Sequence, residues 1–262
     1  MKLTVLNSGS SGNGYVLEAR DSALVLECGV PPKDMFKLSG VPVSKIAGCL
    51  LSHEHLDHAG HAEKYEQLGL HVYASPGTCK ALAAGATKER GRYSPERHLR
   101  PLQAMHMTQI GDWFVTPFDV PHDAAEPLGF MIGHRECGKI LFVTDASFCR
   151  YNFHYACLDH ILVEANYDDG FLNENVVAGR VDAARAERTR RNHMSIRQAC
   201  DLIAANQTAN LKTVLLIHLS GDNADAAAFA RRAAETAPYA HVAVAGKGTT
   251  IELNKIENFA VL

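Results

Sequence analysis

Short apolar runs, most of them rich in β-branched and aliphatic residues, recur along the whole chain and predict strands. They occupy residues 2–6, 15–19, 23–27, 46–51, 71–74, 113–120, 128–132, 139–143, 161–164, 213–217, 242–245 and 249–253. Stretches with helical periodicity lie between some of these runs, at residues 59–68, 77–84, 181–190, 195–205 and 222–236. The pattern therefore predicts sheets flanked by helices.

The order of these elements indicates how the sheets are built. The first half of the chain holds most of the predicted strands in close succession, with Asn-Gly and Gly-rich turns that favour antiparallel pairing. A mixed two-sheet sandwich fits this order better than the continuous βαβ winding of a Rossmann sheet. The sequence has no fixed-period repeat, low-complexity tract or long linker, so we predict that residues 1–262 form a single domain.

Composition narrows the class of protein. Of the 262 residues, 47% are hydrophobic, which allows a substantial core, and the formal net charge is −3, so any contact with nucleic acid must be local. No run approaches the roughly 18 apolar residues of a membrane span, and the first residues lack a signal-peptide pattern. The seven cysteines include no Cys-x-x-Cys pair. We therefore expect a cytoplasmic protein with reduced thiols and no membrane partner.

Two segments are locally basic and could meet phosphates. Residues 88–100 contain five basic side chains, namely Lys88, Arg90, Arg92, Arg97 and Arg100. Residues 180–197 contain six arginines, namely Arg180, Arg185, Arg188, Arg190, Arg191 and Arg197. Because charge runs usually lie in water, a solvated helix face or loop explains either segment equally well.

A run of metal-ligand residue types directly follows the apolar run 46–51. Its sequence is Ser52-His53-Glu54-His55-Leu56-Asp57-His58. His53 and His55 are two residues apart and can project to the same side of an extended strand end, whereas Asp57 and His58 follow on the turn into the next helix. One segment can therefore contribute to two metal sites. A run of surface histidines is the alternative, but so many ligand types after a buried strand would be a costly coincidence.

Further ligands are expected where other strands end in loops, because a scaffold positions functional side chains there. Three residues meet this condition, since each follows a strand-like apolar run: His122, Asp145 and His218.

The order of these residues resembles the signature of the metallo-β-lactamase superfamily, His-x-His-x-Asp-His followed by a distant His, an Asp and a final His. The resemblance implies an α/β fold of four αβ/βα layers, in which two mixed sheets are flanked by helices. It also implies a site for two divalent metal ions. One metal is held by His53, His55 and His122, the other by Asp57, His58 and His218, and Asp145 bridges the two.

Two loops, at residues 7–13 and 121–127, are similar to those of the YycJ/WalJ-like nuclease branch of this superfamily, whose members are proposed to be DNA exonucleases. This resemblance implies a nucleic acid partner, with DNA favoured over RNA. It also makes His193 a candidate for the histidine that contacts phosphate in such nucleases, although an ordinary helix N-terminus at Ser195 would explain the same neighbourhood. A homodimer is compatible with the sequence.

The Ser/Gly/Asn stretch near the N-terminus is a candidate substrate contact, because its backbone N–H groups and hydroxyls could hold a phosphate. The side chains concerned are Ser8, Ser10, Ser11 and Asn13. A simple hairpin turn is an equally good explanation. No Gly-Lys-Ser/Thr follows, so the stretch is not a P-loop.

These residues predict a dinuclear mechanism. A water activated by the two metals would attack phosphorus, with Asp57 orienting it and His193 acting on the departing oxygen or the phosphate. Glu54 should point away from the metals and support the residues around them. Imidazole ligands suit Zn²⁺, and the carboxylates make Mn²⁺ compatible as well.

Other functions on the same scaffold stay open. Hydrolysis of a cyclic phosphodiester, thioester or lactone is the main alternative, whereas a β-lactamase would need export. A di-iron oxidoreductase is disfavoured because that subgroup has Glu where His55 stands. A catalytically silent binding module is disfavoured because such members tend to lose ligands, and this chain keeps the complete set.

Overall fold

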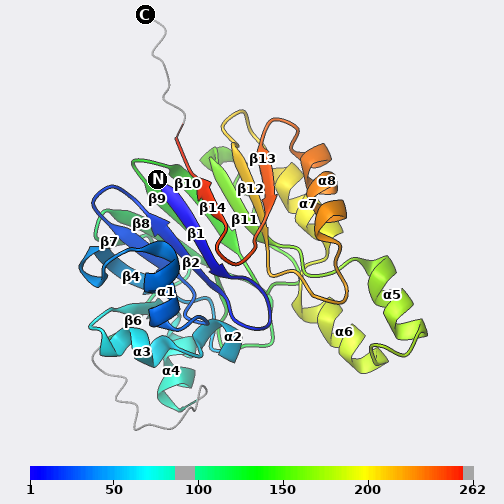
Figure 1. The fold of residues 1–262 in the computed structure, drawn as a ribbon, viewed down its shortest axis with the longest axis horizontal. Coiled ribbons are helices and arrows are strands. Elements are labelled where there is room, and N and C mark those ends of the chain that lie inside the picture. Colours follow the sequence, from blue (N-terminus) through cyan, green and yellow to red (C-terminus); the bar gives the residue numbers. More distant parts are fainter. Residues whose placement is uncertain (86–97, 256–262) are drawn as a thin grey trace, which may run out of the picture.

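The computed structural model describes residues 1–85 and 98–255, and two sheets of seven strands each form its centre (Figure 1). The first sheet has the spatial order β14 (Thr250–Glu252), β1 (Lys2–Asn7), β2 (Gly14–Glu18), β3 (Ala23–Leu26), β4 (Ile46–Leu50), β5 (Val72–Ala74) and β6 (Leu99–Pro101). The second has the order β13 (His241–Val244), β12 (Thr213–Ile217), β11 (His160–Glu164), β10 (Gly138–Val143), β9 (Leu128–His134), β8 (Trp113–Asp119) and β7 (Thr108–Ile110). Both sheets contain parallel and antiparallel pairs.

Helices cover the outer face of each sheet. The first sheet carries α1 (Pro32–Ser39), α3 (Ala62–Gln67) and α4 (Pro76–Ala83), and the second carries α7 (Ile196–Asn206) and α8 (Ala226–Thr236). The short α2 (Leu56–Ala59) follows β4, while α5 (Asp169–Val177) and α6 (Ala183–Asn192) lie together at one side of the molecule (Figure 1). The layers are therefore αβ/βα, which confirms the predicted fold class. Within the described ranges, every helix is too short or too polar to cross a membrane.

The alternation of side chains along the strands explains how three apolar layers form. In β10, Ile140 and Phe142 point into the core between the sheets, whereas Leu141 and Val143 pack under the helices on the outer face. In β3, Leu24 and Leu26 enter the same central core, and Val25 packs under the helices of the other side. A strand that is buried on both faces has a continuous apolar sequence. Such strands are conspicuous in the sequence for this reason.

All of the strands expected from the apolar runs are present, but β6 and β7 were not expected. Each has three residues and contains polar or proline positions, so it gives no apolar run. Helices α1 and α5 were also missed. A signal for α1 existed, because Pro32 stands at its first turn and Gly40 ends it with φ 71°.

The topology places particular strand ends at one edge of the sandwich. Strands β10, β11 and β12 are mutually parallel, so their C-terminal ends lie side by side. Asp145, Glu164 and His218 stand at or just after these ends. The segment after β4, which begins with Leu51, approaches the same edge from the first sheet. Side chains that are far apart in the sequence therefore meet there.

Candidate metal centre

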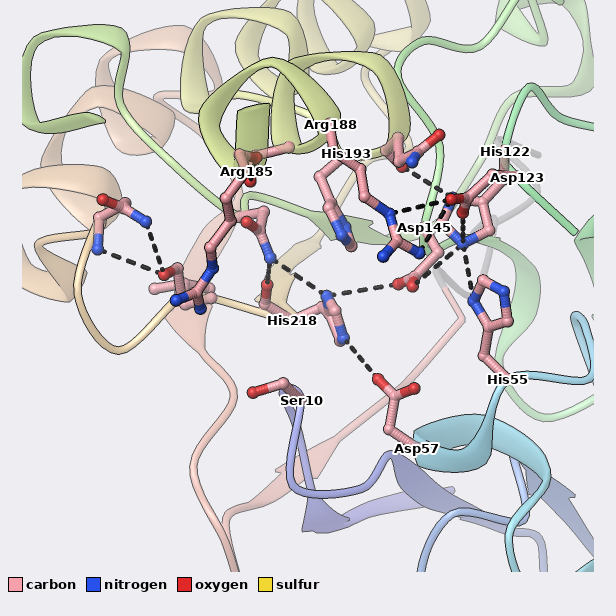
Figure 2. Close-up of a pocket in the computed structure, with 16 residues that line it drawn as sticks. Ser10, His55, Asp57, His122, Asp123, Asp145, Arg185, Arg188, His193 and His218 are labelled. Carbon is pink, nitrogen blue, oxygen red and sulfur yellow. Dashed lines mark hydrogen bonds and ion pairs between the residues drawn. The ribbon is translucent and has the colours of Figure 1, made fainter. Parts of the chain in front are cut away.

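Figure 2 shows His55, Asp57, His122, Asp145 and His218 converging on one pocket from both sheets. These residues lie in segments that follow the ends of four strands. The residue at position 55 precedes α2, which carries position 57. The other three follow β8, β10 and β12 within a few residues.

The structure brings all seven residues of the expected ligand set into two groups that share Asp145. Within each group, one nitrogen or oxygen from every side chain lies within 4.8 Å of the corresponding atoms of the others. One group is His53, His55, His122 and Asp145, and the other is Asp57, His58, Asp145 and His218. This is the grouping that the sequence resemblance implies.

Asp145 occupies the centre of the arrangement. Its Oδ2 lies 3.3 Å from His58 Nε2 and 3.6 Å from His122 Nε2, while Oδ1 lies 3.3 Å from His218 Nδ1. One carboxylate therefore faces ligand atoms of both groups. That position suits a residue that bridges two metals.

Three residues around the centre have a left-handed backbone that is unfavourable for residues other than glycine. Asp145 has φ 43°, His218 has φ 54° and Glu27 has φ 65°. Such conformations cost on the order of 1–3 kcal/mol each and persist where the surroundings hold them. Here they turn the side chains into the site at the points where strands end.

Hydrogen-bond acceptors behind the histidines orient their rings. His122 Nδ1 lies 2.9 Å from the carbonyl oxygen of Asn192. Since a carbonyl only accepts, Nδ1 carries the proton and Nε2 is left for ligation. His58 Nδ1 forms no hydrogen bond within the described residues, but it lies 3.2 Å from Oε2 of the fully buried Glu27, an ion-pair contact on the side of the ring opposite the Nε2 atom that faces Asp145.

The donor set fits divalent metal ions. His53 Nε2 is buried and has no hydrogen-bond partner among the described residues, although His53 Nδ1 lies 2.9 Å from Ser52 Oγ. A buried nitrogen that has no hydrogen-bond partner and faces a carboxylate oxygen at 3.8 Å is suited to ligate a cation held between the two groups. Imidazole nitrogens and carboxylate oxygens together suit Zn²⁺ and Mn²⁺.

The electrostatics of the pocket favour positive charge. Burial favours the neutral form of His218, but Asp145, Asp57 and Glu164 outweigh it and raise the pKa of His218 to about 10. His58 behaves similarly, since Asp145 and Glu27 raise its pKa against the effect of burial. The carboxylates therefore attract cations to this place, whether protons or metal ions.

Glu164 was not singled out as a functional residue from the sequence. It is fully buried, and its Oε1 lies 2.7 Å from His193 Nδ1, while Oε2 accepts hydrogen bonds from the backbone N–H of Ala146 at 3.0 Å and of Met194 at 3.2 Å. Its Oε1 also lies 3.2 Å from His218 Nδ1, and Glu164, Asp145, His193 and His218 form a third group whose ligand atoms lie within 4.8 Å of one another. Both oxygens of Glu164 are thus engaged by neighbouring donors, which suits a residue that orients His193 and His218. A carboxylate that ends the apolar run 161–164 was a usable signal, because a buried charge requires partners.

Glu54 supports the neighbouring loop, in agreement with the expectation that it points away from the metals. Its Oε1 accepts a hydrogen bond from the backbone N–H of Ala125 at 2.8 Å, and Thr78 Oγ1 lies 3.4 Å from its Oε2. Glu54 thereby ties the loop that carries His122 to α4.

The N-terminal residues expected to contact substrate have different surroundings. Ser10 lines the pocket. Ser8 Oγ accepts from the backbone N–H of His218 at 2.8 Å, and the fully buried Asn13 places its Nδ2 3.1 Å from His58 Nε2. Ser11 Oγ accepts from Asn7 Nδ2 at 2.9 Å. A substrate role for these four residues stays a prediction.

The pocket above the centre is a cavity of about 290 Å³ that is lined by polar and charged residues apart from Leu219. Residues of α6, Arg185, Arg188 and Thr189, form one wall, and Ser10, Ser220 and Asn223 lie among the other residues that line it. The arginine segment 180–197 therefore reaches the candidate site. Of the other basic segment, Lys88, Arg90, Arg92 and Arg97 lie outside the described residues.

Comparisons with known proteins agree with this geometry. Residues 34–219 match the profile of the Beta-lactamase superfamily domain. The chain is 26% identical over 229 residues to exodeoxyribonuclease WalJ of Streptococcus pneumoniae, covering 85% of this chain and 82% of that protein. It is 27% identical over 234 residues to exodeoxyribonuclease YycJ of Bacillus anthracis, covering 85% and 84%. The metallo-beta-lactamase fold protein YhfI of Bacillus subtilis superposes with a TM-score of 0.70 at 20% identity, covering 95% of this chain and 98% of that chain. The resemblance seen in the sequence is confirmed.

Proposed function

The chain belongs to the beta-lactamase superfamily, and from this premise we propose that it is a metal-dependent phosphodiesterase that hydrolyses nucleic acid, with DNA favoured over RNA. The observation that carries the proposal is the pair of ligand groups sharing Asp145, with the Glu164–His193 pair beside them. The relatives at 26% and 27% identity are named exodeoxyribonucleases, which supports DNA as the substrate.

The seven-residue set would hold two divalent metal ions, with Zn²⁺ favoured and Mn²⁺ compatible. Metal ions bound there would supply Lewis acidity and would lower the pKa of a water near the scissile phosphate. Asp57 is suited to orient that water, because its Oδ2 lies among the ligand atoms, 3.3 Å from His218 Nε2 and 3.4 Å from His58 Nε2.

His193 is the residue suited to act on the substrate directly. Glu164 Oε1 accepts a hydrogen bond from the Nδ1–H of His193, so the ring can offer only Nε2 to the pocket. The pKa of His193 is raised by Glu164 despite burial, which favours the form with a proton on both nitrogens. Such a ring can donate a hydrogen bond to a phosphate oxygen or transfer a proton to the departing oxygen, a contribution of about 10²–10⁴-fold in rate.

The lining of the pocket suits a phosphodiester better than an apolar acyl group. Among the described residues that line it, Leu219 alone has a purely hydrocarbon side chain. Most small-molecule pockets are predominantly apolar, so a thioester or lactone with a large hydrocarbon part would gain little from burial here.

The test is hydrolysis of end-labelled single- and double-stranded DNA and RNA by protein reconstituted with Zn²⁺ or Mn²⁺. We expect cleavage by the wild type and loss of cleavage in His55→Ala, with metal content falling in parallel. His106→Ala is the matched control, because it removes an exposed imidazole outside the pocket. If the wild type binds two equivalents of metal but cleaves no nucleic acid, the proposal is wrong, and small cyclic phosphodiesters, thioesters and lactones become the substrates to test.

A further inference from the structure

One face of α6 presents arginine side chains to the pocket. Arg185 and Arg188 are three residues apart, so they lie on the same side of the helix as Thr189. Asp182 caps the helix by accepting the backbone N–H of Arg185 at 2.9 Å, which fixes the turn from which Arg185 projects. In Figure 2, Arg185 and Arg188 both extend from this helix toward the cavity that contains His193 and His218.

The two arginines differ in what they contact. The guanidinium of Arg188 is paired with a carboxylate, because its Nε and Nη2 atoms lie 3.0 and 2.9 Å from Oδ2 of Asp123. Arg185 is exposed, and its guanidinium has no acidic partner within residues 1–85 and 98–255. A guanidinium offers five N–H donors and keeps its charge at any physiological pH. Arg185 is therefore an available positive charge on the wall of a site that we assign to phosphodiester chemistry.

The other lining residues indicate which part of a nucleic acid is recognised. Apart from imidazoles, the described lining contains no aromatic ring on which a base could stack. Ser10 offers a hydroxyl group instead, whereas Ser220 and Asn223 are hydrogen-bonded to each other, with Asn223 Nδ2 donating to Ser220 Oγ at 3.3 Å. Hydroxyl and guanidinium contacts to phosphate and sugar carry no sequence information, and the described lining residues include no stacking platform that would hold a base.

The size of the cavity limits how much of a nucleic acid it can hold. A volume of about 290 Å³ is at the lower end of the range for small-ligand pockets, about 300–1,000 Å³. A polynucleotide must therefore leave the cavity over its rim, and the α6 wall is where an adjoining phosphate would meet a free positive charge.

We propose that Arg185 binds a phosphate next to the one that is cleaved, so that the enzyme favours substrates with at least two successive phosphates and does not select their bases. This inference rests on the proposed function. Arg188, held by Asp123, is not assigned this role.

Binding tests the proposal without relying on turnover. Fluorescence anisotropy of a labelled, phosphorothioate-linked octathymidylate, measured with the metal-loaded protein between 50 and 200 mM salt, gives both affinity and salt dependence. We expect Arg185→Ala to weaken binding roughly tenfold, as loss of a charged hydrogen bond does, and to reduce the slope of log K against log salt by about 0.7 for one single-stranded phosphate contact. Arg185→Lys should retain the slope and part of the affinity, because the charge remains.

The matched control is Arg191→Ala. It removes the same charge from the same helix, but Arg191 pairs with Glu187 at 2.9 Å and does not line the cavity. Affinity within twofold of the wild type is expected for this variant. Equal losses of affinity in the Arg185 and Arg191 variants would overturn the proposal. They would indicate that the overall positive charge of the helix, and not a contact made by Arg185, attracts the nucleic acid.

Kinetics separate this proposal from the function it rests on. With bis(p-nitrophenyl) phosphate, which has a single phosphate, the Arg185→Ala loss in kcat/KM should be smaller than with a thymidine dinucleotide that also carries a 5′-phosphate. If the wild type cleaves DNA but Arg185→Ala lowers kcat/KM equally for both substrates, only the role assigned to Arg185 is wrong. If the wild type neither binds nor cleaves nucleic acid, both the assignment and the proposed function are wrong.

Discussion

Replacing Glu164 with glutamine changes a single buried charge behind His193 while conserving shape. In the wild type, Oε1 lies 2.7 Å from His193 Nδ1 and 3.2 Å from His218 Nδ1, and Oε2 accepts from the backbone N–H groups of Ala146 and Met194 at 3.0 and 3.2 Å. Glutamine has one acceptor oxygen and one NH₂ group. It can therefore satisfy only one of these two sides.

The size of the effect depends on which groups the glutamine oxygen contacts. If it stays on the two backbone N–H groups, the NH₂ group faces His193, whose Nδ1 must accept and whose ring becomes neutral. Loss of the acidic imidazole should then lower kcat by about 10²–10⁴-fold with a smaller change in KM. If the oxygen turns to His193, two buried N–H groups lose their acceptor, and the free energy of unfolding should fall by about 1–3 kcal/mol for each.

Steady-state kinetics on a labelled oligonucleotide and urea unfolding, measured on the same preparation, distinguish these cases. Metal content is measured in parallel, because a fall in kcat that merely reflects lost metal does not support an orienting role. Glu174→Gln is the control, since Glu174 is exposed on α5. If Glu164→Gln keeps its metal, its stability and a kcat within threefold of the wild type, then Glu164 does not determine the proton position on His193 and the reasoning is refuted.

Three further predictions concern His160, Glu27 and Gly29. Burial lowers the pKa of His160 to about 4, so between about pH 6.5 and 4 the unfolded chain binds this proton and the folded chain does not. Acidification from pH 7 to 4 should therefore lower the free energy of unfolding of the wild type by on the order of 3 kcal/mol more than that of His160→Leu. Equal pH dependence of the two proteins in urea unfolding would contradict this. Glu27→Gln should lower metal affinity about 10–100-fold by loosening His58, as competition with a chromogenic chelator would show; unchanged affinity argues against an orienting contact. Gly29→Ala should abolish activity, because a Cβ there would lie 1.8 Å from the backbone oxygen of Asp57; normal activity and metal content would mean that this loop can move aside at little cost.

The elements that formed as expected are those whose signal is local. Strands such as β10 and β12 are buried on both faces, so their apolar runs stand out without knowledge of any partner. The segment from His53 to His58 was recognisable for a similar reason, because its ligand types lie within a few residues of one another. Short edge strands such as β6 have no such signal, since pairing with a neighbour is what makes them strands.

Residues that act through distant partners required the tertiary structure. Glu27 and Glu164 lie in apolar runs, and nothing in their local sequence shows which histidine each will meet. The pairing depends on the sheet edge at which β3 and β11 end, which is a property of the assembled sandwich. The same holds for Arg185, which is one of six arginines in the sequence segment 180–197 and is distinguished only by the cavity that it lines and by the absence of an acidic partner among the described residues.

The sequence by itself determined the fold class and the chemical types at the centre, because hydrophobic period and ligand spacing are encoded over a few adjacent residues. Which side chains converge was decided by the tertiary structure. Parallel strands β10, β11 and β12 bring positions 145, 164 and 218 together across gaps of tens of residues. Only that convergence creates the shared carboxylate, the raised pKa values of His58, His193 and His218, and the arginine on the cavity wall that has no acidic partner among the described residues.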